Sequence, residues 1–393
     1  MSEIPDILSD GGSQKLVGAS EHASGTSPLV AGQVAEWLEP VDKAAFDASM
    51  SDFRKFTGKK IAFIFLCIAL CFIAAGLSIG FGTYSISFWD AYMTIWNHIT
   101  GNVQDVIEDI VVVRDRLPRV CVAVLAGAGL AVAGAGMQSI LKNPLAEPYT
   151  TGVSSGAIFG ASLSIVFGFS LFGGDYALVG NAFVFSLIPV AFILMISKMK
   201  NASPTTMIMG GIAIMYIFNA MTTVIRLWSD PDSLSALYSW EVGTLAYAKW
   251  DNLLLMLPIT LFGIVAIGAL SRQLNVLSTG DENARTLGVD ADRLRIIILL
   301  VVAFMTAAIV SYVGLIGFVG LVAPHVVRMV IGADNRFLIP ASIAFGAAVL
   351  LIADLIGKTI IAPATIQVGV IMAFLGGPMF IWLLVRKNTK VWG

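Results

Sequence analysis

Apolar residues in this chain gather in long runs that alternate with short polar stretches. The runs are about 20 residues long, which is the length that an α-helix needs to cross the hydrocarbon core of a bilayer. Two shorter segments, 84–100 and 232–248, are predicted as surface helices, and the pattern as a whole indicates an all-α polytopic membrane protein. The ten predicted spans are 60–82, 119–138, 151–170, 176–197, 205–226, 252–271, 294–313, 316–331, 338–357 and 365–385, of which 316–331 is short for a full crossing.

The composition agrees with this class of protein. Hydrophobic residues make up 57% of the chain and charged residues 13%, whereas soluble domains are typically about 25% charged. The formal net charge of −2 gives no reason to expect a nucleic-acid partner. Neither a disulfide framework nor a metal-ligand spacing is present, so no metal site and no catalytic residues are predicted. The cysteines and histidines are Cys67, Cys71, Cys121, His22, His98 and His325.

The first 58 residues differ from the rest of the chain. They are rich in serine, glycine, alanine and acidic residues, and they lack the basic-then-apolar order of a signal peptide. Such a composition favours a largely disordered tail over residues 1–58. Residues 59–393 are then expected to form one ten-helix transmembrane domain, with the longest internal polar loop at 272–295.

The basic residues predict how the chain is oriented. If both termini are cytoplasmic, sixteen lysines and arginines between residues 54 and 390 face inward and six face outward. The positive-inside rule favours this arrangement, which also requires an even number of spans. The six outward residues are Arg114, Arg116, Arg119, Arg226, Lys249 and Lys358.

Half of these outward charges lie within the short segment 114–119, beside Asp115. Long basic side chains at a helix end often do no more than form a local salt bridge or reach the lipid headgroups. The alternative is a docking site for an acidic partner outside the membrane, because charge complementarity sets the register and the rate of association.

Asp354 lies inside the ninth predicted span, four residues before Lys358. An ionisable residue within a span is a functional candidate by default. Residues four apart share a helix face, so a purely structural ion pair between Asp354 and Lys358 is an equally direct interpretation.

Two polar regions on the predicted cytoplasmic side stand out. The prolines in 143–148 cannot continue a helix and predict a rigid loop. In 272–295, Gly280 and Gly288 predict two short helices, one over Asp281–Leu287 and one that begins near Asp290. Such helices suit a soluble cytoplasmic partner, and a merely solvated connection is the alternative.

Several segments together resemble one family, the FecCD-type permease subunits of binding-protein-dependent ABC importers. The order and number of the motifs carry the resemblance, which covers about residues 60–388. The matching segments are Arg116-Leu-Pro-Arg119, Ala133-Gly-Ala-Gly-Met-Gln138, Asn143-Pro-Leu-Ala-Glu-Pro148, Gly152-Val-Ser-Ser-Gly156, Gly280-Asp-Glu-Asn-Ala-Arg-Thr-Leu-Gly288, Gly317-Phe-Val-Gly-Leu-Val-Ala-Pro-His325, Val368-Gly-Val and Gly376-Gly-Pro-Met-Phe380.

The resemblance implies a type II importer bundle in the cytoplasmic (inner) membrane. It implies a homodimer with two separate ATPase subunits below it and one extracytoplasmic substrate-binding protein above it. ATP would be bound on the ATPases, and this chain would bind no cofactor. The cargo would be a metal chelate, with ferric siderophore expected first and haem or cobalamin as alternatives.

The resemblance also implies roles for individual residues. The outer residues that would engage acids of the binding protein are Arg116, Arg119 and Lys358. The residues that would couple the chain to the ATPases are Gly280, Glu282, Arg285, Gly288 and Arg293. The segment 202–206 falls where the family has a cytoplasmic gate, and the gate or pathway residues are Pro204, Thr205, Asn143 and Pro144.

A competing hypothesis is an ion-coupled secondary transporter that uses Asp354 as its proton or sodium site. It predicts transport driven by an ion gradient without any ATPase. Neither hypothesis makes the chain itself an enzyme.

Overall fold

A computed structural model describes residues 43–200 and 203–385. The chain divides into two units, Met1–Gly58 and Lys59–Gly393, and the second unit contains the predicted transmembrane domain. The tail predicted to be disordered falls mostly outside the described residues, which begin with a helix at Lys43.

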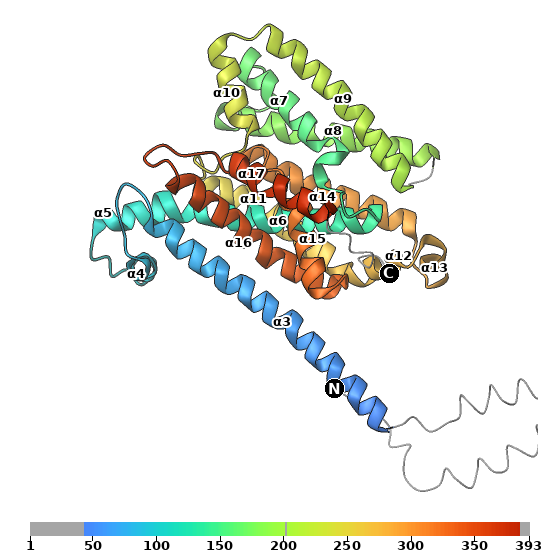
Figure 1. Ribbon diagram of the computed structural model, residues 1–393. Helices are drawn as coiled ribbons and strands as arrows, with labels where there is room; N and C mark the ends of the chain where they lie inside the picture. The colour runs from blue at the N-terminus through green and yellow to red at the C-terminus, as the bar shows by residue number, and fades with distance from the viewer. Residues whose placement is uncertain (1–42, 201–202, 386–393) are drawn as a thin grey trace, which may run out of the picture. The chain divides into compact units, whose positions relative to one another are not determined.

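Helices make up almost all of the regular structure (Figure 1). They are α3 (Lys43–Gly80), α4 (Phe88–Thr100), α5 (Val106–Asp109), η1 (Ile110–Arg116), α6 (Leu117–Leu141), η2 (Pro148–Thr151), α7 (Val153–Phe167), η3 (Gly174–Tyr176), α8 (Ala177–Lys200), α9 (Pro204–Leu227), α10 (Pro231–Glu241), α11 (Trp250–Ala269), α12 (Ser271–Ser278), α13 (Asp281–Thr286), α14 (Ala291–Val313), α15 (Val319–Ile331), α16 (Asn335–Thr359) and α17 (Val368–Val385).

The ten predicted spans are confirmed one for one. Within the described residues, seven helices are long and apolar enough to cross a membrane, and the apolar helices α7, α15 and α17 are shorter. Each of these ten overlaps one predicted span, and α4 and α10 correspond to the two predicted surface helices. The fold is that of an all-α polytopic membrane protein, as predicted.

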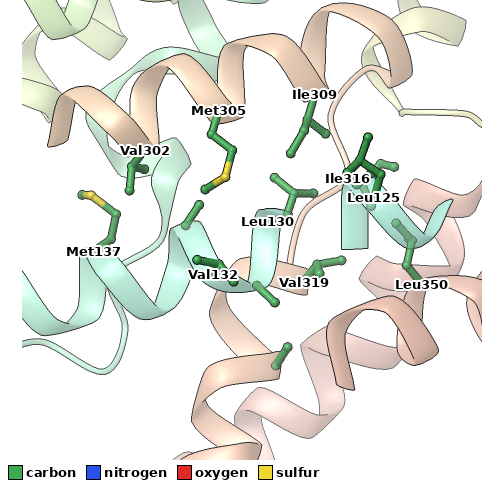
Figure 2. Packing of buried hydrophobic residues seen from close by; sticks show 14 of the residues in the cluster. Leu125, Leu130, Val132, Met137, Val302, Met305, Ile309, Ile316, Val319 and Leu350 are labelled. Atoms are coloured by element: carbon green, nitrogen blue, oxygen red, sulfur yellow. The ribbon is translucent and has the colours of Figure 1, made fainter. Parts of the chain in front are cut away.

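Helix α6 forms the centre of the unit. It packs against α11, α14, α15 and α16, while α7, α8, α9 and α10 gather in a second group (Figure 1). Nearly every α6 side chain from Val122 to Leu141 is buried. Figure 2 shows Leu130 and Val132 of α6 surrounded by Met305 and Ile309 of α14, Val319 of α15 and Leu350 of α16.

Glycines allow α6 to approach its neighbours this closely. A Cβ atom on Gly127 would lie 2.5 Å from the carbonyl oxygen of Gly346 in α16, and a Cβ on Gly134 would overlap the backbone of Gly320. Small residues at helix contacts are what permit such backbone-to-backbone packing in membranes. The α6–α16 contact is therefore this close because Gly127 and Gly346 have no side chains.

Helix α7 is short because the chain folds back into the bundle before α7 begins. Pro148 lies against Gly320, and the carbonyl oxygen of Thr150 lies against Gly211. Gly211 is seven residues into α9, or about 10 Å at 1.5 Å per residue. Irregular backbone at membrane depth survives only where protein buries it, so the predicted rigid loop at 143–148 leads into a re-entrant segment.

A similar constraint shortens α15 and α17. The backbone N–H of Gly369 donates to Gly243 O at 3.2 Å, and Thr244 N–H donates to Val313 O at 2.8 Å. The last residue of α14, just before the segment that leads to α15, and the first turn of α17 thus bond to the segment that follows α10.

The prediction for 272–295 was partly wrong. The first predicted short helix is α13, but the second is not a separate helix. Asp290 caps the N-terminus of α14, where its side chain accepts from the N–H groups of Asp292 and Arg293, both at 3.1 Å. Nothing between Ala291 and the following apolar run interrupts the helix, so it continues into the span. The two short surface helices are α12 and α13.

The close contact between α6 and α16 yields a prediction about stability. Gly127→Ala places a methyl group against the backbone of Gly346 and is expected to cost about 1–3 kcal/mol, the usual range for overpacking. Gly268→Ala in α11 is the matched control, because no atom lies within 4 Å of the added methyl group. Thermal unfolding in detergent would show a lowered midpoint for Gly127→Ala alone. Equal midpoints for both variants would contradict the packing argument.

Candidate functional site

One end of the bundle, which we call the pocket end, carries a basic pocket. It lies where α3 and α16 finish and α6 begins. The cavity has a volume of about 1140 Å³. Its charged lining residues are the basic Arg114, Arg116, Arg119, Lys249 and Lys358 and the acidic Asp115 and Asp251. Five basic against two acidic side chains make the pocket positively charged.

A buried carboxylate lies beneath the pocket and holds two of its basic lining residues. Asp354 is only 1% exposed and receives hydrogen bonds from Arg119 Nε at 3.1 Å to both oxygens and from Arg119 Nη2 at 2.8 Å. Lys358 Nζ lies 2.9 Å from the second oxygen of Asp354 and also donates to Ser78 Oγ at 2.9 Å. The ion pair suggested by the four-residue spacing is present, and Arg119 joins it from a different helix.

Arg116 has a different role at the base of the same pocket. Its guanidinium donates to the carbonyl oxygens of Ile79, Gly80 at 3.1 Å and Tyr84 at 2.5 Å. These carbonyls belong to the C-terminal end of α3 and the turn after it, where intrahelical donors are lacking. A Cβ on Gly82 would collide with this guanidinium. Arg116 therefore fixes the end of α3 against the start of α6.

The rim of the pocket carries two further basic residues, to which the family resemblance assigned no docking role. Arg114 and Lys249 are exposed, and their side chains make no ion pair with the residues that the structure describes. Trp250 Nε1 donates to Val113 O at 2.9 Å, which holds the start of α11 beside Arg114. Both basic residues were among the predicted outward charges, but no sequence pattern indicates that segments so far apart meet.

The opposite end of α6, called the loop end, carries a second charged cluster. Asp281 Oδ1 accepts from Lys142 Nζ at 2.7 Å, and the two Asp281 oxygens accept from Arg295 Nη2 at 2.7 and 2.8 Å. Arg295 is 1% exposed and also donates to Ile140 O at 3.2 Å and to Asp292 at 3.3 Å. The hydrogen bond from Arg295 lowers the pKa of Asp281 to about 2, with a further contribution from Lys142. The cluster ties α13 to both α6 and α14.

The predicted coupling residues lie around this cluster, mainly on the surface. Gly280 and Gly288 flank α13 with φ values of +122° and +81°, in the region that favours glycine. Glu282, Arg285 and Arg293 are exposed. Arg285 pairs with Asp292 at 3.2 Å and Arg293 pairs with Asp290 at 3.1 Å.

The predicted gate residues also lie at the loop end. Pro204 begins α9, where Ser203 Oγ caps the helix by accepting from Thr206 N–H at 3.2 Å, and Thr205 is exposed. Asn143 and Pro144 form the turn after α6, in which Asn143 Oδ1 accepts from Leu145 N–H at 2.9 Å. The part of the gate segment at residue 202 lies outside the described residues.

Comparisons with known proteins point to one family. The model of the FecCD transport family matches residues 67–386. The chain is 39% identical over 332 residues to the hemin transport system permease protein HmuU of Yersinia pestis, covering 83% of this chain and 96% of the relative. It is 36% identical over 339 residues to the Fe(3+)-citrate import system permease protein YfmE of Bacillus subtilis, covering 86% and 98%.

A solved structure matches the fold as well. It is an inward-facing conformation of a protein assigned as a metal-chelate type ABC transporter. The TM-score is 0.73 at 31% sequence identity, and the match covers 82% of this chain and 99% of that chain.

The buried carboxylate at the pocket end yields a second prediction. Asp354→Asn leaves Arg119 and Lys358 close together without a counterion and is expected to cost about 3–5 kcal/mol, as when one partner of a buried pair is removed. The matched control is Asp290→Asn, which weakens an exposed pair worth about 0–1 kcal/mol and keeps a side chain that can cap α14.

The measurement is thermal unfolding of both variants in the same detergent. Adding Lys358→Met to Asp354→Asn should recover part of the loss, because it removes one of the two uncompensated cations. If Asp354→Asn lost no more stability than Asp290→Asn, Asp354 would not be the buried counterion that holds Arg119 and Lys358 together.

Proposed function

Because the chain belongs to the FecCD transport family, we propose that it is the membrane-spanning permease subunit of an ABC importer for a metal chelate. The observation that carries this proposal is the presence of two differently built charged surfaces at opposite ends of α6. One is a concave basic pocket, and the other is a pair of short surface helices tied to the bundle by Asp281. This is what a subunit needs if it receives one partner on each side of a membrane.

In this proposal the pocket end faces outward and both termini are cytoplasmic. The pocket receives acidic side chains of a substrate-binding protein, with Arg114 and Lys249 at the rim making the first contacts. Arg116, Arg119 and Lys358 form the floor. Exposed charges at a rim mainly accelerate association, whereas buried charges fix the register of the bound complex.

The loop end receives a separate ATPase subunit. The exposed side chains of Glu282, Arg285 and Arg293 offer mixed charges to it, and Leu287 at 66% exposure offers an apolar contact between them. ATP is bound and hydrolysed on that partner, and this chain supplies no cofactor. Asp281 keeps the coupling helices attached to the transmembrane bundle while the partner moves.

The functional unit is a homodimer with its pathway along the subunit interface. The packing of the subunit supports this arrangement, because α6 at its centre is buried along nearly all its length. A passage wide enough for a metal chelate has no room through such a core. A second copy would provide the other wall of the pathway, near Pro204 and Thr205 at its cytoplasmic end.

Ferric siderophore is the substrate we propose first, with haem and cobalamin as the alternatives. The two relatives described above are named for hemin and Fe(3+)-citrate, so an iron chelate is the shared chemistry. The secondary-transporter hypothesis loses its main support, since both oxygens of Asp354 are already held by Arg119 and Lys358. A free ion-binding carboxylate is therefore not offered at that position.

ATP-dependent uptake tests the proposed function directly. The chain would be reconstituted in proteoliposomes with its ATPase and binding protein and offered ferric siderophore, haem and cobalamin in parallel. Uptake of one of them that requires ATP and both partners is the expected result. Uptake driven by an ion gradient without the ATPase would refute the importer proposal and favour the secondary transporter.

Charge reversal at the rim gives a narrower prediction. Arg114→Glu should weaken binding of the substrate-binding protein on the order of tenfold at low salt, since a rim charge acts mainly on association. The difference should shrink as salt screens the exposed charge. Arg272→Glu, an exposed reversal in α12 at the loop end, is the matched control and should leave this affinity unchanged. Equal affinities for Arg114→Glu and wild type at low salt would exclude Arg114 from the docking surface.

A further inference from the structure

Helix α4 lies beside the last turns of α3 at the pocket end (Figure 1). The ring of Tyr92 stacks on Phe72 with centroids 4.3 Å apart, and the Tyr92 hydroxyl donates to Phe72 O at 2.5 Å. The rings of Phe88 and Tyr92 cover Gly76 so closely that a Cβ there would collide with them. Both rings belong to the first turns of α4, so α4 is level with residues 72–76 of α3.

Residues 72–76 of α3 lie within the thickness of the lipid bilayer. Phe72 is eight residues before Gly80, which places it about 12 Å below the end of α3. The apolar part of α3, Lys55–Gly80, has 26 residues. It is therefore about 39 Å long, some 9 Å more than the hydrocarbon core of about 30 Å. Even if the whole surplus lay at the pocket end, Phe72 would still be within the apolar layer.

One face of α4 is apolar and uncovered. Successive residues of a helix are 100° apart, so Trp89, Met93, Trp96 and Ile99 fall within an arc of about 120°. Tyr92 lies toward the Ile99 edge of this arc and packs on Phe72. Trp89 is 69% exposed, Trp96 62% and Ile99 72%. No charged residue falls within this arc.

The polar residues of α4 point to another side. Thr94 Oγ1 donates to Glu108 at 2.5 Å, and His98 Nδ1 lies 2.9 Å from Asp109. These contacts hold the two carboxylates on the polar side of α4, and of the arc only Met93, at its edge, lines a small cavity with them. The helix thus has a packed face, a polar face and an apolar face, which is the pattern of a helix that lies in the membrane interface.

We propose that α4 is immersed in the lipid leaflet at the pocket end, with the arc of Trp89, Met93, Trp96 and Ile99 in contact with phospholipid. The apolar arc continues the exposed apolar surface of α3, on which Phe65 is 67% and Ile73 48% exposed. Tryptophan is enriched at the border between the headgroups and the acyl chains, because its ring is apolar and its N–H is polar.

Immersion of α4 has a consequence for the pocket. The turn between α3 and α4 contributes Phe81, Gly82 and Thr83 to the pocket lining. The same turn is held by Arg116 through Tyr84 O. Lipid contact on α4 is therefore linked to the part of the pocket wall that this turn forms.

Tryptophan quenching tests the proposal on the full chain without any partner. The protein would be reconstituted in phosphatidylcholine vesicles in which part of the lipid is brominated, either near the carboxyl end or near the methyl end of its acyl chains. Carboxyl-end bromines should quench wild-type fluorescence more strongly than methyl-end bromines. The double variant Trp89→Phe/Trp96→Phe should show a smaller difference, and Trp228 and Trp382, which are also exposed, should keep the remainder.

Trp240→Phe is the matched control, because that indole packs among buried residues of another cluster and should leave the quenching pattern unchanged. Single variants at Trp89 and Trp96, checked for a wild-type elution profile, guard against misfolding of the double variant. Quenching of this pair by aqueous acrylamide but not by bromolipid would place the arc in water. Protection from both quenchers would mean that protein covers the arc. Either result would overturn the proposal.

Discussion

The structure depends on the contact between α6 and α16. Gly127 and Gly346 bring the two backbones together, and each end of the pair is closed by polar contacts. At the pocket end Arg119 of α6 holds Asp354 of α16. At the loop end Ser139 Oγ of α6 donates to Asn335 Oδ1 of α16 at 3.3 Å. Nearby, Lys142 after α6 holds Asp281, and Asn275 of α12 bonds to Asp334 at 2.7 Å at the start of α16. The 25 residues of α6 span about 38 Å, so one helix pair joins both charged surfaces.

Each of the two charged clusters contains a buried charge that is held by groups of opposite sign, but the signs are reversed between the clusters. Asp354 is a buried anion held by two cations, so the floor of the pocket keeps a net positive charge. Arg295 is a buried cation held by Asp281 and Asp292, so the loop end is close to neutral there. Buried ion pairs seldom add much stability, because desolvation offsets their attraction. Their value lies in fixing which helices meet, and this suits sites that must keep their shape when partners bind.

The sequence predicted the fold far better than the site. Runs of apolar residues identified all ten spans, because the length of a bilayer-crossing helix is set by physics that acts locally on the chain. The four-residue spacing also found the Asp354–Lys358 pair. Three other contacts could not be predicted from the sequence, since each depends on packing between distant segments. They are the contact of Arg119 with Asp354, the position of Lys249 at the pocket rim and the contact of Asp281 with Arg295. The re-entrant turn before α7 was not predicted for the same reason. The apolar pattern indicates which residues are buried, but not the depth in the membrane at which a helix begins.

The central claim is that an outward docking pocket and an inward coupling segment are held by one pair of helices. The most direct test is the ATPase rate of the reconstituted complex, measured with and without the binding protein, in wild type and in Asp281→Asn. The account predicts that the binding protein stimulates the wild-type rate and that Asp281→Asn loses this stimulation while still binding the protein. An unchanged wild-type rate, or full stimulation of Asp281→Asn, would contradict it.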